Sequence, residues 1–304
     1  MRASSPPVGK RKSRRTWPVV TAVCLALVLV LLLGLRALLL SDLRYLQGIS
    51  NLSPFFRNGS LGQTALSALT GIPANPYDRT AFARQPDGAI FYTGQAPTWQ
   101  GIDVSVHQGT IDWTRVRQAG IAFAMVRVAA RSHGASGLLT EDPNWKTNVQ
   151  GALDAGLAVG VYVFSQATSP KEAREEADFV LERISGYPIT YPVVFDWEPL
   201  EGYAARTDNL SSEVLTEACL AFCTAVQEAG YRPMVYTNLS VGLVQYDLRR
   251  LAGYDFWLAQ YHDAPTFYGA FQIWQYSCTG TVPGISTPVD RNLSFCDYAS
   301  MGAK

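Results

Sequence analysis

The alternation of strand-like and helix-like segments is the feature that most constrains the fold of this chain. Short runs rich in β-branched and aromatic residues predict five strands, at Gly101–Ser105, Phe123–Ala129, Leu157–Ser165, Tyr191–Glu198 and Arg232–Asn238. The segments between them predict helices at Trp113–Ala119, Trp145–Ala155, Pro170–Ile184 and Ser211–Ala229. Such an alternation predicts a parallel sheet covered by helices.

After residue 239 the chain keeps its strands but has no long helical pattern. Three more strands are predicted there, at Asp255–Tyr261, Phe271–Ser277 and Pro288–Phe295. Eight strands favour a closed barrel, although roughly 200 residues is near the lower size limit of that architecture. We therefore predict an α/β fold: an irregular TIM-like β/α barrel of five β/α units followed by three strands, in a domain spanning residues 89–304.

The beginning of the chain has a different character. Residues 1–15 hold six basic residues and no acid, although the formal net charge of all 304 residues is zero. Because the basic residues are confined to a short tail and the remainder is acidic, we expect no nucleic acid partner. Residues 41–88 mix Gly, Pro, Asn and Ser with short apolar runs, which predicts a stalk.

Residues 16–40 are nearly all apolar, which is long enough for a helix that crosses a membrane. The alternative is a cleaved signal peptide, but its apolar stretch is usually only about 7–15 residues, and no clear cleavage site follows Leu40. Basic residues stay on the cytoplasmic side. We therefore expect a single-pass anchor in the cell membrane, with residues 1–15 in the cytoplasm and the C-terminal domain outside.

Two acidic residues end the fourth predicted strand. Asp196 and Glu198 are two residues apart, so their side chains share one face, roughly 6.6 Å apart along the strand. In a parallel barrel, functional residues gather at the C-terminal strand ends. A structural ion pair with an arginine is the alternative, but two acids in an apolar strand are costly to bury. We favour a catalytic role.

Further acids lie in the first and last strands, where Asp103 and Asp290 occur. Either alone suits a helix cap or a turn, but closing the barrel would bring the two strands together. Aromatic residues lie near several strand ends: Tyr162, Tyr236, Trp257, Tyr261, Trp274 and Tyr276. Some must belong to the core. Carboxylates surrounded by aromatic rings nevertheless indicate a site for a sugar.

Several motifs resemble glycoside hydrolase family 25 in their order along residues 101–296. They are Gly101-Ile-Asp-Val-Ser-Val-His-Gln-Gly-Thr-Ile-Asp-Trp113, Val161-Tyr-Val-Phe-Ser165, Val193-Val-Phe-Asp-Trp-Glu198, Val235-Tyr-Thr-Asn238, Phe256-Trp-Leu-Ala-Gln-Tyr261 and Ile273-Trp-Gln-Tyr-Ser277. The family's members are muramidases, which cut peptidoglycan between N-acetylmuramic acid and N-acetylglucosamine. The resemblance implies the same barrel of five β/α units and three strands, and the same activity. One departure is Val163, where many members have His.

The resemblance also assigns roles to residues. The family's Asp-x-Glu pair corresponds to Asp196 and Glu198, with Glu198 as the general acid. Asp196 is expected to stay ionised and to stabilise positive charge on the reacting sugar, and orienting the acetamido group of the substrate as nucleophile is a second role open to it. Substrate contacts are expected at Asp103, Asp290, Tyr162, Tyr236, Trp274, Gln260 and Tyr261. The strand spacing leaves retention and inversion open.

Other functions and partners follow from the same pattern. A wall-binding module without catalysis and a glycosidase of another specificity, such as one acting on chitin, are the alternatives. We expect no cofactor and no metal, because only three scattered histidines occur and no CxxC motif. Cys278 and Cys296 flank a loop and suit a disulfide outside the cell, although sequence does not establish the pairing. The oligomeric state is open.

Overall fold

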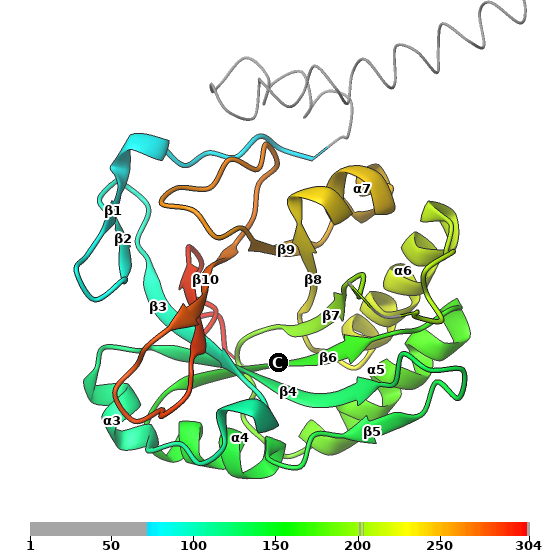
Figure 1. Cartoon of the computed structure of the whole chain (residues 1–304), viewed down its shortest axis with the longest axis horizontal. Coiled ribbons are helices and arrows are strands. Elements are labelled where there is room, and N and C mark those ends of the chain that lie inside the picture. The colour runs from blue at the N-terminus through cyan, green and yellow to red at the C-terminus, as the bar shows by residue number, and fades with distance from the viewer. Residues whose placement is uncertain (1–71, 201, 203, 303–304) are drawn as a thin grey trace, which may run out of the picture. The chain divides into compact units, whose positions relative to one another are not determined.

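The computed structural model describes residues 72–200, 202 and 204–302. In these residues eight strands form a closed barrel, and a further strand pairs beside it (Figure 1). The barrel strands are β3 (Trp99–Val104), β4 (Phe123–Arg131), β6 (Ala158–Ser165), β7 (Val193–Trp197), β8 (Pro233–Asn238), β9 (Asp255–Ala259), β10 (Ile273–Gly280) and β11 (Val289–Ser294). The main helices are α3 (Trp113–Gln118), α4 (Trp145–Asp154), α5 (Pro170–Ile184), α6 (Ser212–Glu228) and α7 (Leu248–Leu251).

The strand order confirms the predicted barrel. Neighbouring strands follow β3-β11-β10-β9-β8-β7-β6-β4, and β3 pairs with β4 to close the ring. The pairings from β3 through β4 to β10 are parallel, whereas β11 is antiparallel to both β10 and β3. In this register Asp290 lies directly opposite Asp103. Closure therefore brings together the first and the last of the four carboxylates expected at the site.

Local sequence explains where the covering helices begin and how they pack. Ser169 and Ser211 each accept a hydrogen bond from a backbone N–H in the first turn of α5 and α6, which satisfies donors that the helix itself leaves unpaired. Phe222 of α6 packs against Phe195 on the outer face of β7, with ring centroids 5.3 Å apart. The helices thus hold the outward-facing strand residues, and the inward-facing residues are left to fill the barrel.

The interior of the barrel is packed with large side chains. Phe123, Met125, Met234 and Trp257 belong to one buried cluster there. Gly101 lies against Phe123, and a Cβ at this position would overlap the phenyl ring. A small residue on β3 therefore accommodates a large one on β4, as close packing of a narrow barrel requires.

Residues 72–92, which we call the N-terminal strap, cover the side of the barrel that lacks helices. The strap ends in a hairpin of β1 (Phe82–Arg84) and β2 (Ile90–Tyr92). Tyr77 stacks on Phe295 with ring centroids 3.7 Å apart, and Phe82 packs edge-on against Trp274. The predicted boundary between stalk and domain at residue 88 therefore falls inside a hairpin that packs on the barrel.

Several expectations concern residues that the structure does not describe. The basic tail (1–15), the predicted membrane segment (16–40) and most of the predicted stalk lie outside the described residues. Over the described part of the chain, no helix combines the length and hydropathy needed to cross a membrane. Cys278 and Cys296 are free thiols here, so the suggested disulfide is not formed.

Candidate active site

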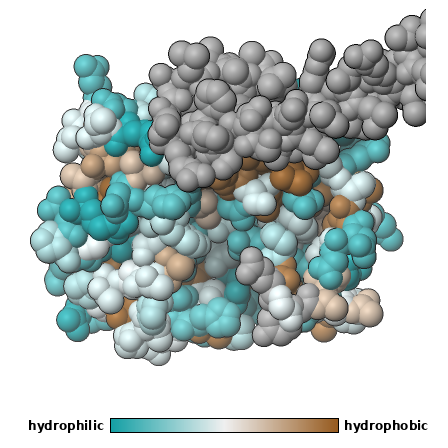
Figure 2. Space-filling model, turned by 45° about the horizontal axis from the view of Figure 1, so that its top comes forward, coloured by the Kyte–Doolittle hydropathy of each residue, from teal (hydrophilic) through white to brown (hydrophobic). Residues whose placement is uncertain are grey.

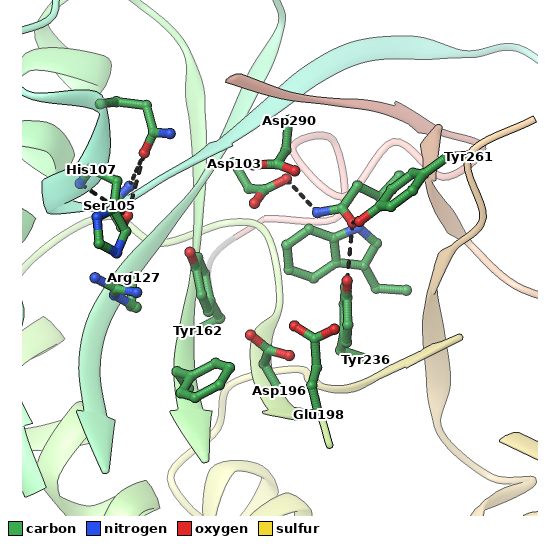
Figure 3. Close-up of a pocket in the computed structure, with 14 residues that line it drawn as sticks. Asp103, Ser105, His107, Arg127, Tyr162, Asp196, Glu198, Tyr236, Tyr261 and Asp290 are labelled. Atoms are coloured by element: carbon green, nitrogen blue, oxygen red, sulfur yellow. Dashed lines mark hydrogen bonds between the residues drawn. The ribbon is translucent and has the colours of Figure 1, made fainter. Parts of the chain in front are cut away.

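A cavity of about 220 Å³ opens at the C-terminal ends of the barrel strands. It is lined by four carboxylates, four aromatic rings of Tyr and Trp, and several polar side chains: Asp103, Ser105, His107, Gln108, Arg127, Tyr162, Phe164, Asp196, Glu198, Tyr236, Trp257, Tyr261, Gln275 and Asp290 (Figure 3). The face in Figure 2 shows hydrophilic residues interspersed with smaller hydrophobic patches. The carboxylates and aromatic rings gathered in the cavity make it the candidate active site.

Asp196 and Glu198 come from the end of β7. All five residues of this strand are buried, and Glu198 follows the strand and is only partly buried. Figure 3 shows both carboxyl groups pointing into the cavity beside Tyr236. One oxygen of Asp196, Oδ1, is buried and has no hydrogen-bond partner. An unpaired buried acceptor is costly, so this oxygen is suited to a donor that a ligand would bring.

Burial and neighbouring charges keep protons on this pair. Burial, together with the Asp290 carboxylate, raises the pKa of Glu198 to about 7, while the nearby Tyr236 hydroxyl acts in the opposite direction. Burial also raises the pKa of Asp196 well above its usual range, and the Glu198 carboxylate adds to this rise. At neutral pH, Glu198 thus has a substantial protonated fraction, as a general acid requires.

Asp103 lies in a connected network on the other side of the cavity. Its Oδ2 accepts hydrogen bonds from Gln275 Nε2 (2.9 Å) and Asn292 Nδ2 (2.7 Å). Gln275 Oε1 in turn accepts hydrogen bonds from the hydroxyls of Tyr236 and Tyr261, each at 3.0 Å. One amide therefore fixes three cavity residues, which come from β3, from β8 and from the segment after β9.

Asp290 faces Asp103 across the β3–β11 pairing. Burial raises the pKa of Asp290 to about 6. The pKa of Asp103 is raised by its burial and by the Asp290 carboxylate, while the hydrogen bonds from Asn292 and Gln275 oppose the rise. All four carboxyl groups of the cavity thus have raised pKa values, an arrangement typical of catalytic carboxylates.

The backbone of Glu198 is held from the neighbouring strand end. The buried Gln166 donates from Nε2 to the carbonyl oxygen of Glu198 (3.1 Å) and of Ser165 (3.0 Å). Its Oε1 accepts a hydrogen bond of 2.7 Å from the Thr207 hydroxyl. Gln166 therefore ties the segments after β6 and β7 together directly beneath the acid.

The structure brings together most, but not all, of the residues expected at the site. Asp103, Asp290, Tyr162, Tyr236 and Tyr261 line the cavity together with the Asp196–Glu198 pair. Tyr261 is half-exposed at its edge, with 50% of its surface accessible. This group agrees with the prediction that strand ends would converge.

Trp274 and Gln260 do not line the cavity. In β10, Ile273 and Gln275 face inward, so alternation sends Trp274 outward against Phe82 of the strap. Gln260 binds Thr266 through both ends of its amide, at 2.6 and 2.7 Å, and so holds a loop. Their expected role as substrate contacts does not fit these positions.

Val163, the departure from the family pattern, is also buried away from the cavity lining.

Sequence reasoning missed several cavity residues. Gln275 and Arg127 are the main ones, and Trp257 was noted only as one of the aromatics. For Arg127 a signal exists, because it is a single charge in the otherwise apolar run Phe123–Ala130. For Gln275 the signal is weaker, since a glutamine in a strand also suits an edge or a surface. Among the described residues, no cluster of three or more His, Cys, Asp and Glu side chains has the arrangement of a metal site.

Chemically, the cavity combines a protonated carboxyl group, further carboxylates and flat apolar rings. Such a set can bind a sugar, donate a proton to a glycosidic oxygen and stabilise positive charge on the reacting ring.

Similarity to known proteins agrees with this chemistry. Lysozyme M1 of Streptomyces globisporus is 29% identical over 235 residues, which cover 73% of each chain. The autolytic lysozyme of Clostridium acetobutylicum is 27% identical over 63% of this chain and 54% of its own length.

Solved structures show the same fold. The crystal structure of the bacterial lysozyme from Streptomyces coelicolor has a TM-score of 0.53 and 28% identity, over 65% of this chain and 92% of that one. The autolysin LytC from Streptococcus pneumoniae, crystallised in complex with a synthetic peptidoglycan ligand, has a TM-score of 0.57. It is 22% identical over 70% of this chain, which spans about half (52%) of the autolysin, and this likeness shows the fold alone.

The family itself is identified by a match over more than half of the chain. Residues 102–285 match the model of glycosyl hydrolases family 25 and include Asp103, Asp196 and Glu198. The chain therefore belongs to glycosyl hydrolases family 25.

Proposed function

We propose that this glycoside hydrolase is a muramidase that hydrolyses the β-1,4 bond between N-acetylmuramic acid and N-acetylglucosamine in peptidoglycan. The observation that carries the proposal is the position of Glu198, whose raised pKa of about 7 leaves it partly protonated in a cavity with three other carboxylates. The similarity to lysozymes of two bacteria supports peptidoglycan as the substrate.

In this proposal Glu198 protonates the leaving glycosidic oxygen while the bond to the sugar C1 breaks. Asp196 lies next to it with an unpaired Oδ1. The acetamido N–H of the substrate would donate a hydrogen bond to that oxygen and, by bonding to the charged form, would favour the carboxylate of Asp196. The acetamido oxygen is then oriented to attack C1, which is a recognised exception to the mechanism with two protein carboxylates.

The remaining cavity residues bind the sugar in this proposal. Asp103 and Asp290 accept hydrogen bonds from sugar hydroxyls, and the half-exposed ring of Tyr261 offers an apolar surface at the cavity edge. Tyr162 and Tyr236 line the walls. The presence of all four carboxylates favours catalysis over a wall-binding module that has lost it.

We further propose that residues 16–40 anchor the protein in the cell membrane with the hydrolase domain outside. The apolar composition of this segment and the basic tail before it support the proposal. Extraction with carbonate and with detergent separates the two outcomes. An anchored chain stays in the membrane pellet until detergent is added, whereas release by carbonate would contradict the anchor.

The activity is tested by digesting purified peptidoglycan with the full chain and identifying the reducing ends of the products. Muramic acid at the new reducing ends, absent from a digest with the Glu198→Gln variant, is the expected result. N-acetylglucosamine at the reducing ends would show another specificity. Wall binding without any release of fragments would contradict the hydrolase mechanism.

A further inference from the structure

One side of the cavity is basic. Among the described residues that line it, Arg127 and His107 carry the basic side chains, and the acids lie opposite them. Figure 3 shows His107, Ser105 and Arg127 grouped on one side, with Tyr162 between Arg127 and Asp196. The assigned catalytic steps use neither basic residue. The Arg127 guanidinium needs hydrogen-bond acceptors, and its one carboxylate partner, Asp142, binds only two of its three nitrogens.

Arg127 is held from behind by a buried carboxylate. Its Nε and Nη2 both lie 2.9 Å from Asp142 Oδ2, and the Asp142 side chain is fully buried. Asp142 also accepts backbone hydrogen bonds from Val106 and Asn144, each at 3.0 Å. The guanidinium is therefore fixed in orientation. Its third nitrogen, Nη1, takes part in none of the hydrogen bonds found among the described residues, and 16% of the side chain is exposed.

The chemistry of the substrate indicates what this nitrogen could bind. N-acetylmuramic acid differs from N-acetylglucosamine by a lactyl ether on C3, which ends in a carboxylate or, in intact peptidoglycan, in a peptide carbonyl. C3 is adjacent to C2, which bears the acetamido group. If Asp196 receives the acetamido N–H, the lactyl group leaves the ring from the next carbon. Arg127 is close enough to Asp196 for its charge to oppose the rise in the pKa of that acid.

We propose that Arg127 is a specificity-determining residue, whose Nη1 donates to the lactyl carbonyl or carboxylate oxygen of the muramic acid bound beside Asp196. This inference rests on the proposed muramidase function. Because Asp142 balances the charge of Arg127, the guanidinium can donate to the neutral carbonyl of a peptide-substituted lactyl group as well as to a free carboxylate. A chitin chain has no group to bind there, so the residue discriminates between the two polysaccharides.

The test measures binding rather than turnover. The full chain with Glu198→Gln is titrated with two tetrasaccharides: one alternates N-acetylmuramic acid and N-acetylglucosamine, and the other contains N-acetylglucosamine alone. Adding Arg127→Gln is expected to raise the Kd for the muramic acid ligand about tenfold to hundredfold, the range of one hydrogen bond to a charged group. The Kd for the other ligand is expected to change less than about twofold on the same grounds.

Control variants separate recognition from stability. Arg115→Gln removes an exposed charge from α3 and is expected to change neither Kd. Asp142→Asn combined with Arg127→Gln removes both partners, which avoids leaving a buried carboxylate unpaired, and is expected to show the same selective loss. Thermal unfolding confirms that each variant is folded at the assay temperature.

Equal weakening of both ligands, or no weakening of either, would overturn the role of Arg127. That outcome differs from failure of the proposed function, in which the wild-type chain would release no muramic acid reducing ends from peptidoglycan.

Discussion

Replacing Asp290 with Asn is expected to move the alkaline limit of activity to lower pH. Glu198 must be protonated to act as an acid, so activity falls as pH rises through its pKa of about 7. Asp290 has a pKa of about 6, so near pH 7 it is mostly ionised, and its negative charge is one cause of the raised pKa of Glu198. Removing that charge lowers the pKa of Glu198.

The size of the effect follows from the electrostatics of the cavity mouth. Two unit charges about 6–12 Å apart, in an effective dielectric constant of about 20, interact by about 1.4–2.8 kcal/mol. This corresponds to a change of about one to two in pKa. A Glu198 with a pKa near 6 is only about one-tenth protonated at pH 7, compared with about half in the wild type. When activity is expressed relative to each enzyme's own plateau at acidic pH, the variant at pH 7 is therefore about fivefold or more less active than the wild type.

The assay is kcat/KM for peptidoglycan fragments measured from pH 4 to pH 9, with each profile normalised to its own plateau. Normalisation takes out of the comparison any weaker sugar binding caused by the loss of the Asp290 carboxylate, because weaker binding lowers the plateau of kcat/KM without moving the alkaline limb of the profile. Asp154→Asn, an exposed acid on α4, is the matched control and is expected to leave the profile in place. An alkaline limb that stays put or moves to higher pH in Asp290→Asn would refute the reasoning.

Three further predictions concern the support of the site. In the wild type, Arg131 Nε lies 2.6 Å from the buried carboxylate of Glu176. Arg131→Met leaves that carboxylate without its ionic partner, so the free energy of unfolding in urea should fall by about 3–5 kcal/mol. An unchanged value would contradict the pairing. Gln166→Leu removes the hydrogen bond to the Glu198 carbonyl, so steady-state kinetics should show kcat about tenfold lower with KM within about twofold; a change in KM alone would contradict positioning. Trp274→Ala should lower unfolding stability by about 3–5 kcal/mol through lost packing under the strap while KM stays unchanged, and a large rise in KM would show that Trp274 does contact substrate.

Much of the barrel was predictable because its local signals agree with one another. Gly120, Gly156 and Gly230 follow helices and have positive φ angles of 88°, 78° and 85°, a conformation that glycine adopts without strain. Closure of the barrel predicted that Asp103 and Asp290 would meet, and the β3–β11 register places them opposite each other. The convergence of carboxylates therefore followed from topology and the strand-end rule rather than from any single motif.

The errors come from contacts that sequence patterns do not contain. The strap has little periodicity. Its aromatic residues find their partners on β10 and just after β11, roughly 190–220 positions later in the chain, where no helix covers the barrel. Side chains in β10 alternate between the two faces of the sheet, but the alternation alone does not say which face is inward. Only the packing shows that Ile273 and Gln275 face the interior and that Trp274 therefore faces outward. A domain starting at residue 89 would have lost β1, the first strand of the strap hairpin.

The roles of Arg127 and Gln166 were hidden for a related reason. A lone arginine in a strand and a glutamine after a strand each suit many environments. Their functions emerge only when Asp142 and Thr207, from later loops, fix their orientation toward the cavity and toward Glu198.

The central claim is that Glu198 protonates the leaving oxygen, and the most direct test varies the need for that proton. Wild type and Glu198→Gln are compared on peptidoglycan fragments and on a nitrophenyl β-glycoside of N-acetylmuramic acid, whose leaving group departs readily without a proton. We expect the variant to lose about 10²- to 10⁴-fold in kcat/KM on the fragments, and less than about tenfold on the nitrophenyl substrate. Equal losses on both substrates, or full activity of the variant on the fragments, would contradict the claim.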